Sequence, residues 1–333
     1  MCTAVSFKTR DHYFGRNLDL EFSYHESVTV TPRRFPLRFH RLPALENHFA
    51  LIGVAYVAKG YPLYYDATNE KGLSMAGLNF PENAVWRPYV AGKENVTPFE
   101  LIPWVLGQCA TTAEAVGRLS RVNALDEAFS ENLPLSPLHW LLADAEKSVV
   151  VEITENGLML YDNPVGVLTN NPPFRFQMQR LADFMNLSCH PPKNTFSETL
   201  PLPAYSRGMG AIGLPGDWSS ASRFVRAAFT KLNSVCGSGE AESVSQFFHI
   251  LNSVEQPCGS IRLENGKCEI TIYSSCCNTR TGVFYYKTYG NSRICAVDMH
   301  REDLDGDALV SYPLLREADI LLQNGKPEAR RTQ

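Results

Sequence analysis

The chain starts with Met1-Cys2-Thr3-Ala4-Val5, which places a cysteine directly behind the first methionine. Removal of Met1 would leave a thiol and a free α-amine on one residue, a nucleophile together with its general base. The reference pKa is about 7.7–8.0 for the α-amine and about 8.5 for the thiol, so the amine can accept a proton near neutral pH. Most cysteines at position 2 have no such role, so other residues must supply what Cys2 needs.

A catalytic thiol needs a cation to favour the thiolate, an anion to orient the amine, and amide donors for an oxyanion. The segment Phe14-Gly15-Arg16-Asn17-Leu18-Asp19 offers a cation and an anion in a strand-like pattern. Alternation along a strand points Arg16 and Asp19 to opposite faces, so both can reach one site only if the strand bends or ends there. Gly15 would permit a bend. The competing interpretation is a weak ion pair on a surface turn.

Two asparagines stand where predicted strands end. Pro81 follows Asn79 by two residues, Pro172 follows Asn170 by two residues, and proline cannot continue a sheet ladder. Such asparagines are ordinary turn residues. At strand ends they could also present amide donors to an oxyanion.

Arg223 is a further candidate. It follows the glycine- and proline-rich loop at 213–218 and falls in the first turn of a predicted helix. The helix dipole disfavours a cation at this end, so we expect Arg223 to have a partner elsewhere in the fold. The competing interpretation is a solvated arginine.

The order of strand and helix patterns predicts the α+β class. Strands are expected over residues 3–8, 13–16, 27–31, 49–57, 64–68, 73–78, 138–143, 148–154, 158–161, 165–169, 269–273, 283–288 and 293–297. Helices are expected from a capping box at 97–100 onward, and over 112–119, 174–185, 219–232 and 241–251. Antiparallel-style runs with grouped helices favour layered antiparallel sheets. Without a linker or repeat, we expect one domain over residues 2–325 and a polar tail over 326–333.

Composition argues against several classes of protein. The 333 residues are 44% hydrophobic, enough for a sizeable core, and a net charge of −4 offers no basic surface for nucleic acid. No apolar run approaches the ~18 residues of a membrane span, and no export signal is recognisable. Nine irregularly spaced cysteines without Cys-x-x-Cys indicate reduced cytosolic thiols. Eight scattered histidines give no zinc-ligand spacing, so no metal is expected.

Several short sequence motifs follow one another in a particular order along the chain. Each motif alone is weak evidence of a family, but the ordered set is strong. The motifs are Met-Cys-Thr at 1–3, Phe-Gly-Arg-Asn-Leu-Asp at 14–19, Asn-Glu-Lys-Gly-Leu at 69–73, Ala-Gly-Leu-Asn-Phe at 76–80, Gly-Val-Leu-Thr-Asn at 166–170, Gly-Leu-Pro-Gly-Asp with Ala-Ser-Arg-Phe at 213–224, and Tyr-Tyr-Lys-Thr-Tyr with Ala-Val-Asp-Met near 285–299. In these motifs the chain resembles the choloylglycine hydrolase family, which contains bile salt hydrolases and penicillin V acylases.

The resemblance implies the four-layer αββα sandwich of N-terminal nucleophile (Ntn) hydrolases, with two stacked antiparallel sheets between helical layers. It implies that Cys2 attacks an amide carbonyl and that its α-amine relays the proton to the leaving amine. It further implies that Asp19 orients this amine and that Arg16 favours the thiolate. No metal or cofactor is implied, and family members of this type are commonly homotetramers.

The resemblance also assigns the remaining site residues. It implies that Asn170 and the Asn79 region stabilise the oxyanion and that Arg223 completes the polar network. Asparagine at 79 matches the bile salt hydrolases, where penicillin V acylases often carry tyrosine. Apolar or amphipathic side chains suit a steroid face. The implied pocket positions are Leu18, Tyr24, Ala58, Tyr65, Phe129, Leu133 and Leu138.

We therefore expect a bacterial, cytoplasmic bile salt hydrolase that cleaves glycine or taurine from conjugated bile acids, with no nucleic-acid or membrane partner. Three alternatives remain at this point. They are a penicillin V acylase, a catalytically silent steroid or lipid binder of the same fold, and a thiol redox sensor in which Cys2 is only an exposed thiol.

Overall fold

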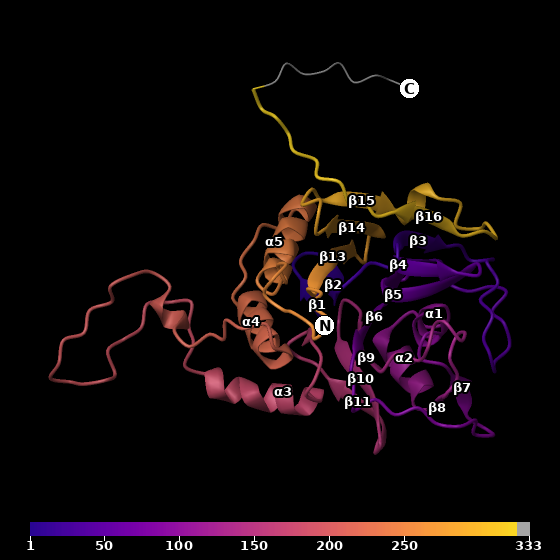
Figure 1. Ribbon diagram of the computed structural model, residues 1–333, viewed down its shortest axis with the longest axis horizontal. Helices are drawn as coiled ribbons and strands as arrows, with labels where there is room; N and C mark the ends of the chain where they lie inside the picture. Colours follow the sequence, from indigo (N-terminus) through magenta and orange to yellow (C-terminus); the bar gives the residue numbers. More distant parts are fainter. Residues whose placement is uncertain (325–333) are drawn as a thin grey trace.

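The computed structural model describes residues 1–324, and within them two antiparallel sheets are stacked face to face (Figure 1). The strand order of the first sheet is β12 (Val167–Leu168), β1 (Cys2–Lys8), β2 (His12–Leu20), β13 (Ile270–Asn278), β14 (Val283–Thr288) and β15 (Cys295–Asp298). The strand order of the second sheet is β11 (Gly157–Asp162), β10 (Ser148–Thr154), β9 (Leu138–Ala143), β6 (Ser74–Asn79), β5 (Tyr61–Asn69), β4 (Leu51–Ala58), β3 (Ser27–Thr31) and β16 (Val310–Pro313). Strands β7 (Glu94–Val96) and β8 (Val122–Ala124) pair in parallel outside these sheets.

Helices cover the outer face of each sheet. Helices α4 (Ser220–Leu232) and α5 (Glu240–Asn252) lie against the first sheet, with α3 (Phe174–Arg180) beside α4 (Figure 1). Helix α1 (Leu101–Leu106) lies against the second sheet, with α2 (Thr112–Leu119) beside it. The four-layer αββα sandwich expected from the sequence is confirmed. Within the described part of the chain, no helix is long and apolar enough to cross a membrane.

The predicted hairpin between β5 and β6 forms as the sequence indicates. The side-chain oxygen of Asn69 accepts the backbone N–H groups of Lys71 and Leu73, each at 3.0 Å. Gly72 adopts φ +91°, a left-handed conformation that glycine tolerates best. This turn leads the chain into β6, whose last residue is Asn79.

Some element ends differ from the sequence prediction. The helix expected over 174–185 ends at Arg180 and continues as a 3-10 turn over Leu181–Phe184. The helix expected after the capping box begins only at Leu101. The Glu100 carboxylate accepts the N–H of Thr97 at 3.1 Å, but the Thr97 hydroxyl has no hydrogen-bond partner within residues 1–324, so half of the box forms. The tail expected over 326–333 lies outside the described residues, and one domain over 2–325 stays a prediction.

Candidate active site

Cys2 opens β1, which lies between β12 and β2 in the first sheet, and is only 3% exposed. It pairs with Leu18 of β2, so the segment 14–19 runs directly beside it. Strand alternation holds along β2. Arg16 faces the second sheet, where its Nη1 donates to the carbonyls of Tyr65 (3.0 Å) and Gly77. Because Cys2 is the first residue of its strand, groups on both faces of the sheet can reach it.

Strand β2 ends at Leu20, so Asp19 reaches the site without a bend at Gly15. Asp19 lies on the helix-covered face, 3.9 Å from the Arg223 guanidinium of α4. A Cβ at Gly15 would lie 2.0 Å from the carbonyl oxygen of Ser275. Gly15 therefore permits the close approach of β13.

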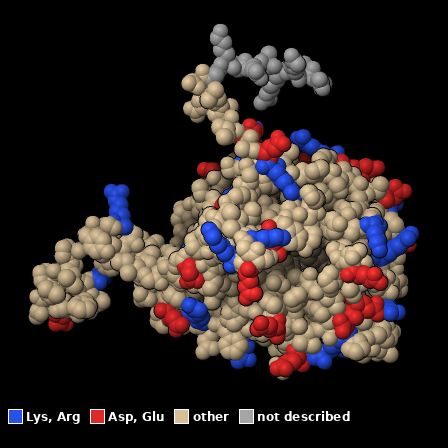
Figure 2. All heavy atoms as spheres, in the orientation of Figure 1, with Lys and Arg blue, Asp and Glu red and all other residues tan. Residues whose placement is uncertain are grey.

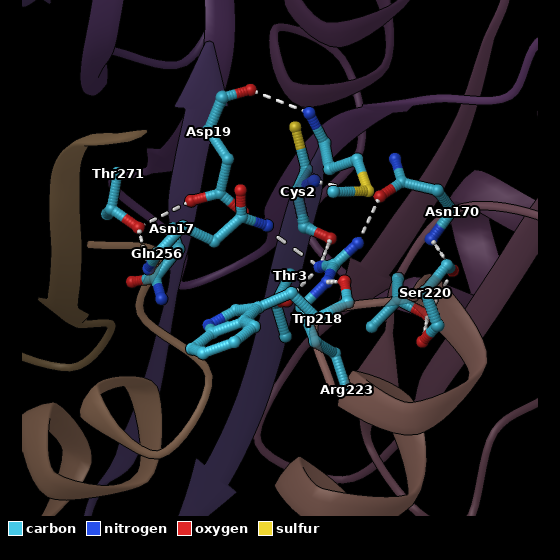
Figure 3. A network of polar contacts seen from close by, with 12 residues as sticks. Cys2, Thr3, Asn17, Asp19, Asn170, Trp218, Ser220, Arg223, Gln256 and Thr271 are labelled. Atoms are coloured by element: carbon cyan, nitrogen blue, oxygen red, sulfur yellow. Dashed lines mark hydrogen bonds and ion pairs between the residues drawn. The ribbon is translucent and has the colours of Figure 1, made fainter. Parts of the chain in front are cut away.

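On the helix side, Arg223 of α4 binds the start of β1 and two loops (Figure 3). Its Nη1 donates to the Cys2 carbonyl and to the Thr3 hydroxyl, both at 2.6 Å. Its Nη2 donates to the Asn170 side-chain oxygen at 2.7 Å, and its Nε donates to the Trp218 carbonyl at 3.0 Å. Burial lowers the pKa of Arg223, and the charges of Asp19 and Cys2 oppose this effect. The partner expected for this arginine is thus the start of β1.

Asn170 connects Arg223 to Cys2. Its Oδ1 accepts the backbone N–H of Cys2 at 2.8 Å as well as the Arg223 Nη2. Guanidinium groups only donate, so this contact fixes which end of the amide is oxygen. The Asn170 Nδ2 then donates to the Asn79 carbonyl at 2.7 Å. One of the two N–H donors of the Asn170 amide is therefore engaged, and its oxygen contacts the Cys2 nitrogen.

Asp19 is fully buried beside the start of the chain. Its Oδ1 accepts the Thr271 hydroxyl at 2.6 Å (Figure 3). Burial raises the pKa of Asp19, while the nearby Arg223 opposes the rise. In this chain, which retains Met1, the Met1 ammonium donates to the Asp19 carbonyl at 2.7 Å and to the Glu269 carboxylate. Asp19 thus lies within reach of groups at the chain terminus.

On the inner side, Arg16 lies between the two sheets with no exposed surface. Burial alone lowers the pKa of its guanidinium, but the negative groups around it, Cys2 first and then Tyr273 and Asp66, outweigh burial and raise that pKa. Asp66 itself accepts the hydroxyls of Tyr273 and Ser275. The Arg16 Nη2 has no hydrogen-bond partner among the described residues. A charged donor is therefore left available on the cavity side of Cys2.

Next to Cys2 and Arg16 lies a cavity of about 370 Å³ with a mainly apolar lining. Figure 2 shows a hollow on the face that carries the N-terminus, with acidic and basic side chains interspersed around it. Six of the seven predicted pocket positions line this cavity: Leu18, Tyr24, Tyr65, Phe129, Leu133 and Leu138. Ala58 does not belong to this lining; it is buried at the end of β4, opposite Tyr61. Asn79 also lines the cavity and is exposed.

The sequence prediction missed several residues of this cluster. Thr271 and Glu269 lie beside Asp19 and the terminal amine, and Thr3 and Trp218 bind Arg223. Thr271 and Glu269 come from a region about 250 positions from Asp19, and no local motif marks them. Thr3 could have been noted, because it is part of the Met-Cys-Thr block. Among residues 1–324, no group of His, Cys, Asp or Glu side chains could hold a metal ion.

Two stacked antiparallel sheets between helices, with a buried cysteine at the start of an inner strand, define the class of Ntn hydrolases. Residues 2–312 match the model of the linear amide C–N hydrolases, choloylglycine hydrolase family. The chain belongs to this family, so the resemblance seen in its motifs is confirmed, as is the expectation of a linear amide hydrolase.

Curated relatives match along nearly the whole chain. The chain is 54% identical to a "Bile salt hydrolase/transferase" of Lactiplantibacillus plantarum, over 97% of this chain and 100% of that protein. It is 37% identical to a "Bile salt hydrolase/transferase" of Clostridium perfringens, over 94% of this chain and 96% of that protein.

Solved structures agree with this assignment. A conjugated bile acid hydrolase from Clostridium perfringens (mutant C2A) matches with a TM-score of 0.90 and 35% identity, covering 97% of this chain and 100% of the other. A penicillin V acylase from Agrobacterium tumefaciens matches with a TM-score of 0.69, over 93% of this chain and 90% of the other. The identity to the acylase is only 19%, so this second likeness shows the fold alone.

Proposed function

We propose that the protein is a bile salt hydrolase that releases glycine or taurine from conjugated bile acids. The observation that carries the proposal is the apolar cavity of about 370 Å³ that borders Cys2, Arg16 and Asn79. A polycyclic acyl group suits such a lining, while its amide can approach the polar groups at Cys2. The relatives at 54% and 37% identity, which are named for bile salts, favour this substrate class.

The proposed reaction starts after removal of Met1, which frees the Cys2 amine. The amine accepts the thiol proton, and the sulfur attacks the amide carbonyl carbon to give a tetrahedral oxyanion. When the C–N bond breaks, the amine hands the proton to the leaving nitrogen, so glycine or taurine departs and a thioester remains. Water then attacks the thioester, with the same amine as base, and releases the bile acid and the free thiol.

The supporting roles follow from the contacts. We assign Asn170 and Arg223 to holding the Cys2 nitrogen, because they bond to it and to the Cys2 carbonyl. Asp19 orients the freed amine. The unpaired Arg16 Nη2 favours the thiolate from the cavity side. The proposed oxyanion donors are the side-chain amide of Asn79, exposed at the cavity, and the second N–H of the Asn170 amide.

The acyl group is proposed to contact the six predicted pocket residues that line the cavity (Leu18, Tyr24, Tyr65, Phe129, Leu133 and Leu138). Ala58 is left out of this set because it does not reach the cavity wall. The buried position of Cys2 disfavours the redox-sensor alternative, which needs an exposed thiol.

Incubation of the purified protein with glycocholate, taurocholate and penicillin V tests the proposal. We expect release of glycine and taurine. Release of phenoxyacetate without either amino acid would instead identify a penicillin V acylase. Binding of the bile salts without turnover, in protein whose Met1 has been removed, would identify the silent binder.

We also propose a homotetramer in the cytoplasm. Residues 186–217 extend away from the two sheets as an arm (Figure 1). Apolar side chains are exposed along it: Phe196, Leu200, Leu202, Tyr205 and Ile212. Exposed apolar side chains on a projecting segment favour contact with another copy. Sedimentation analysis should give four copies, and a smaller assembly for the pair Phe196→Ser and Tyr205→Ser; a monomeric wild type would contradict the proposal.

A further inference from the structure

A second cavity, of about 400 Å³, adjoins the cavity at Cys2. Phe99 and Phe129 line both cavities, with ring centroids 5.2 Å apart in an edge-to-face arrangement. The Phe129 ring also packs against Tyr61, at a centroid distance of 6.0 Å. Because the same two rings belong to both linings, they form a wall that the two cavities share.

The rim of the second cavity is basic. Arg38 and Lys59 line it, both are exposed, and neither forms an ion pair with any other residue of 1–324. Lys59 stands in the turn between β4 and β5 with φ +51°, followed by Gly60 at φ +75°. The turn thus holds an ammonium-bearing side chain at the cavity edge. An unpaired guanidinium and an unpaired ammonium at one rim favour an anionic guest.

The interior of the second cavity also has an unmet polar group. The Tyr61 hydroxyl is buried and has no hydrogen-bond partner among the described residues. A buried hydroxyl without a partner is costly, so a guest that pairs it would be favoured. The neighbouring Glu100 carboxylate is already engaged, because it accepts the backbone N–H of His40 at 2.6 Å and that of Thr97 at 3.1 Å. Because its negative charge repels an anion, the anionic group of a guest would bind at the rim, away from Glu100.

We propose that the second cavity binds an anionic ester, such as a sulfate, on the end of the acyl group farthest from the scissile amide. This inference rests on the proposed function and extends it to a class of substrates. The first cavity is at the small end of the roughly 300–1,000 Å³ typical of ligand pockets. A steroid that fills it from Cys2 to Phe99 has its distal substituent at the shared rings. Beyond them, Arg38 and Lys59 bind the sulfate oxygens.

Hydrolysis of two glycine conjugates of one bile acid, with and without a sulfate ester on the ring hydroxyl farthest from the amide, tests the proposal. We expect the wild type to cleave both, with the lower KM for the sulfated substrate. The double variant Arg38→Gln/Lys59→Met should raise KM for the sulfated substrate roughly three- to tenfold and change the unsulfated KM less than about twofold. Arg34→Gln, an exposed cation outside both linings, is the matched control. Equal effects on both substrates, or no effect, would overturn the inference.

Equilibrium binding separates this inference from the proposed function. If neither conjugate is cleaved, the proposed function fails, and a steroid sulfate without an amide then tests the cavity alone. The wild type should bind this sulfate more tightly than the parent steroid, and the double variant should lose the difference. Added salt should weaken sulfate binding selectively, since the rim charges are exposed. Equal affinity of the wild type for the two steroids would refute the site.

Discussion

Cys2 lies between two unlike environments. On the helix side, Arg223 donates through all three guanidinium nitrogens to protein oxygens, and Asn170 uses both ends of its amide. On the side of the second sheet, Arg16 keeps one nitrogen unpaired and Asn79 is exposed to a cavity. The first environment therefore holds the backbone of Cys2 in place. The second keeps donors free for a substrate.

The largest expected effect comes from the sulfur atom that joins the two sides. Cys2→Ser should lower kcat at least ~10³-fold, because a hydroxyl is a far weaker nucleophile than a thiolate. The rate of amino-acid release from a conjugated bile acid measures this kcat. Bile-salt affinity should stay within a few-fold, since the cavity is unchanged. Full turnover in this variant would refute the assignment of the nucleophile.

On the cavity side, Asn79→Ala should lower kcat roughly 10²–10³-fold, which is typical for loss of one oxyanion donor. The thermal midpoint should hardly move, because the Asn79 side chain is exposed and the carbonyl that accepts from Asn170 remains. Steady-state kinetics and thermal unfolding of the same preparation measure kcat and the thermal midpoint. An unchanged kcat would remove Asn79 from the site.

On the helix side, Arg223→Met should act mainly on stability. It deletes four hydrogen bonds of a fully buried guanidinium and leaves Asp19 without its nearby cation, so we expect a loss of about 3–5 kcal/mol. Chemical denaturation measures the free energy of unfolding. Stability equal to the wild type, with activity lost, would mean that Arg223 acts in the reaction rather than in holding Cys2.

The smallest expected effect lies at the opposite end of the β1–β2 hairpin. Burial lowers the pKa of His12 from 6.5 to about 4. Between these values the unfolded chain binds the proton more readily, so His12 should destabilise the fold by up to roughly 3 kcal/mol as the pH falls from 6.5 to 4.

Urea unfolding at several pH values measures this contribution. His12→Gln should flatten the stability profile in that window, and the exposed His300→Gln should not. Both variants should keep their turnover at pH 7, because neither residue is near Cys2. If the free energy of unfolding of His12→Gln falls as steeply with pH as that of the wild type, other groups cause the loss of stability.

Local patterns predicted much of the fold. Alternation located β1 and β3 closely, and the Asn-Glu-Lys-Gly turn located the β5–β6 hairpin. Alternation also placed Arg16 and Asp19 on opposite faces, which the structure confirms. Strand β16 was not predicted, because its pairing with β3 joins segments about 280 residues apart.

The site was less accessible to sequence reasoning. The roles of Arg16, Asp19, Asn79, Asn170 and Arg223 stay predictions, although the structure brings these residues around Cys2. The Asn170 side-chain oxygen accepts from Arg223, which lies 53 positions further along the chain. This contact turns the amide nitrogen toward the Asn79 carbonyl. Long-range contacts of this kind have no signature in a single sequence.

The central claim is that the nucleophile and its base are the thiol and the freed α-amine of Cys2. The most direct test is intact mass and N-terminal sequencing of protein that cleaves conjugated bile acids. The active protein should begin at Cys2, and a form that retains Met1 should be inactive. Full turnover by protein that still carries Met1 would contradict it.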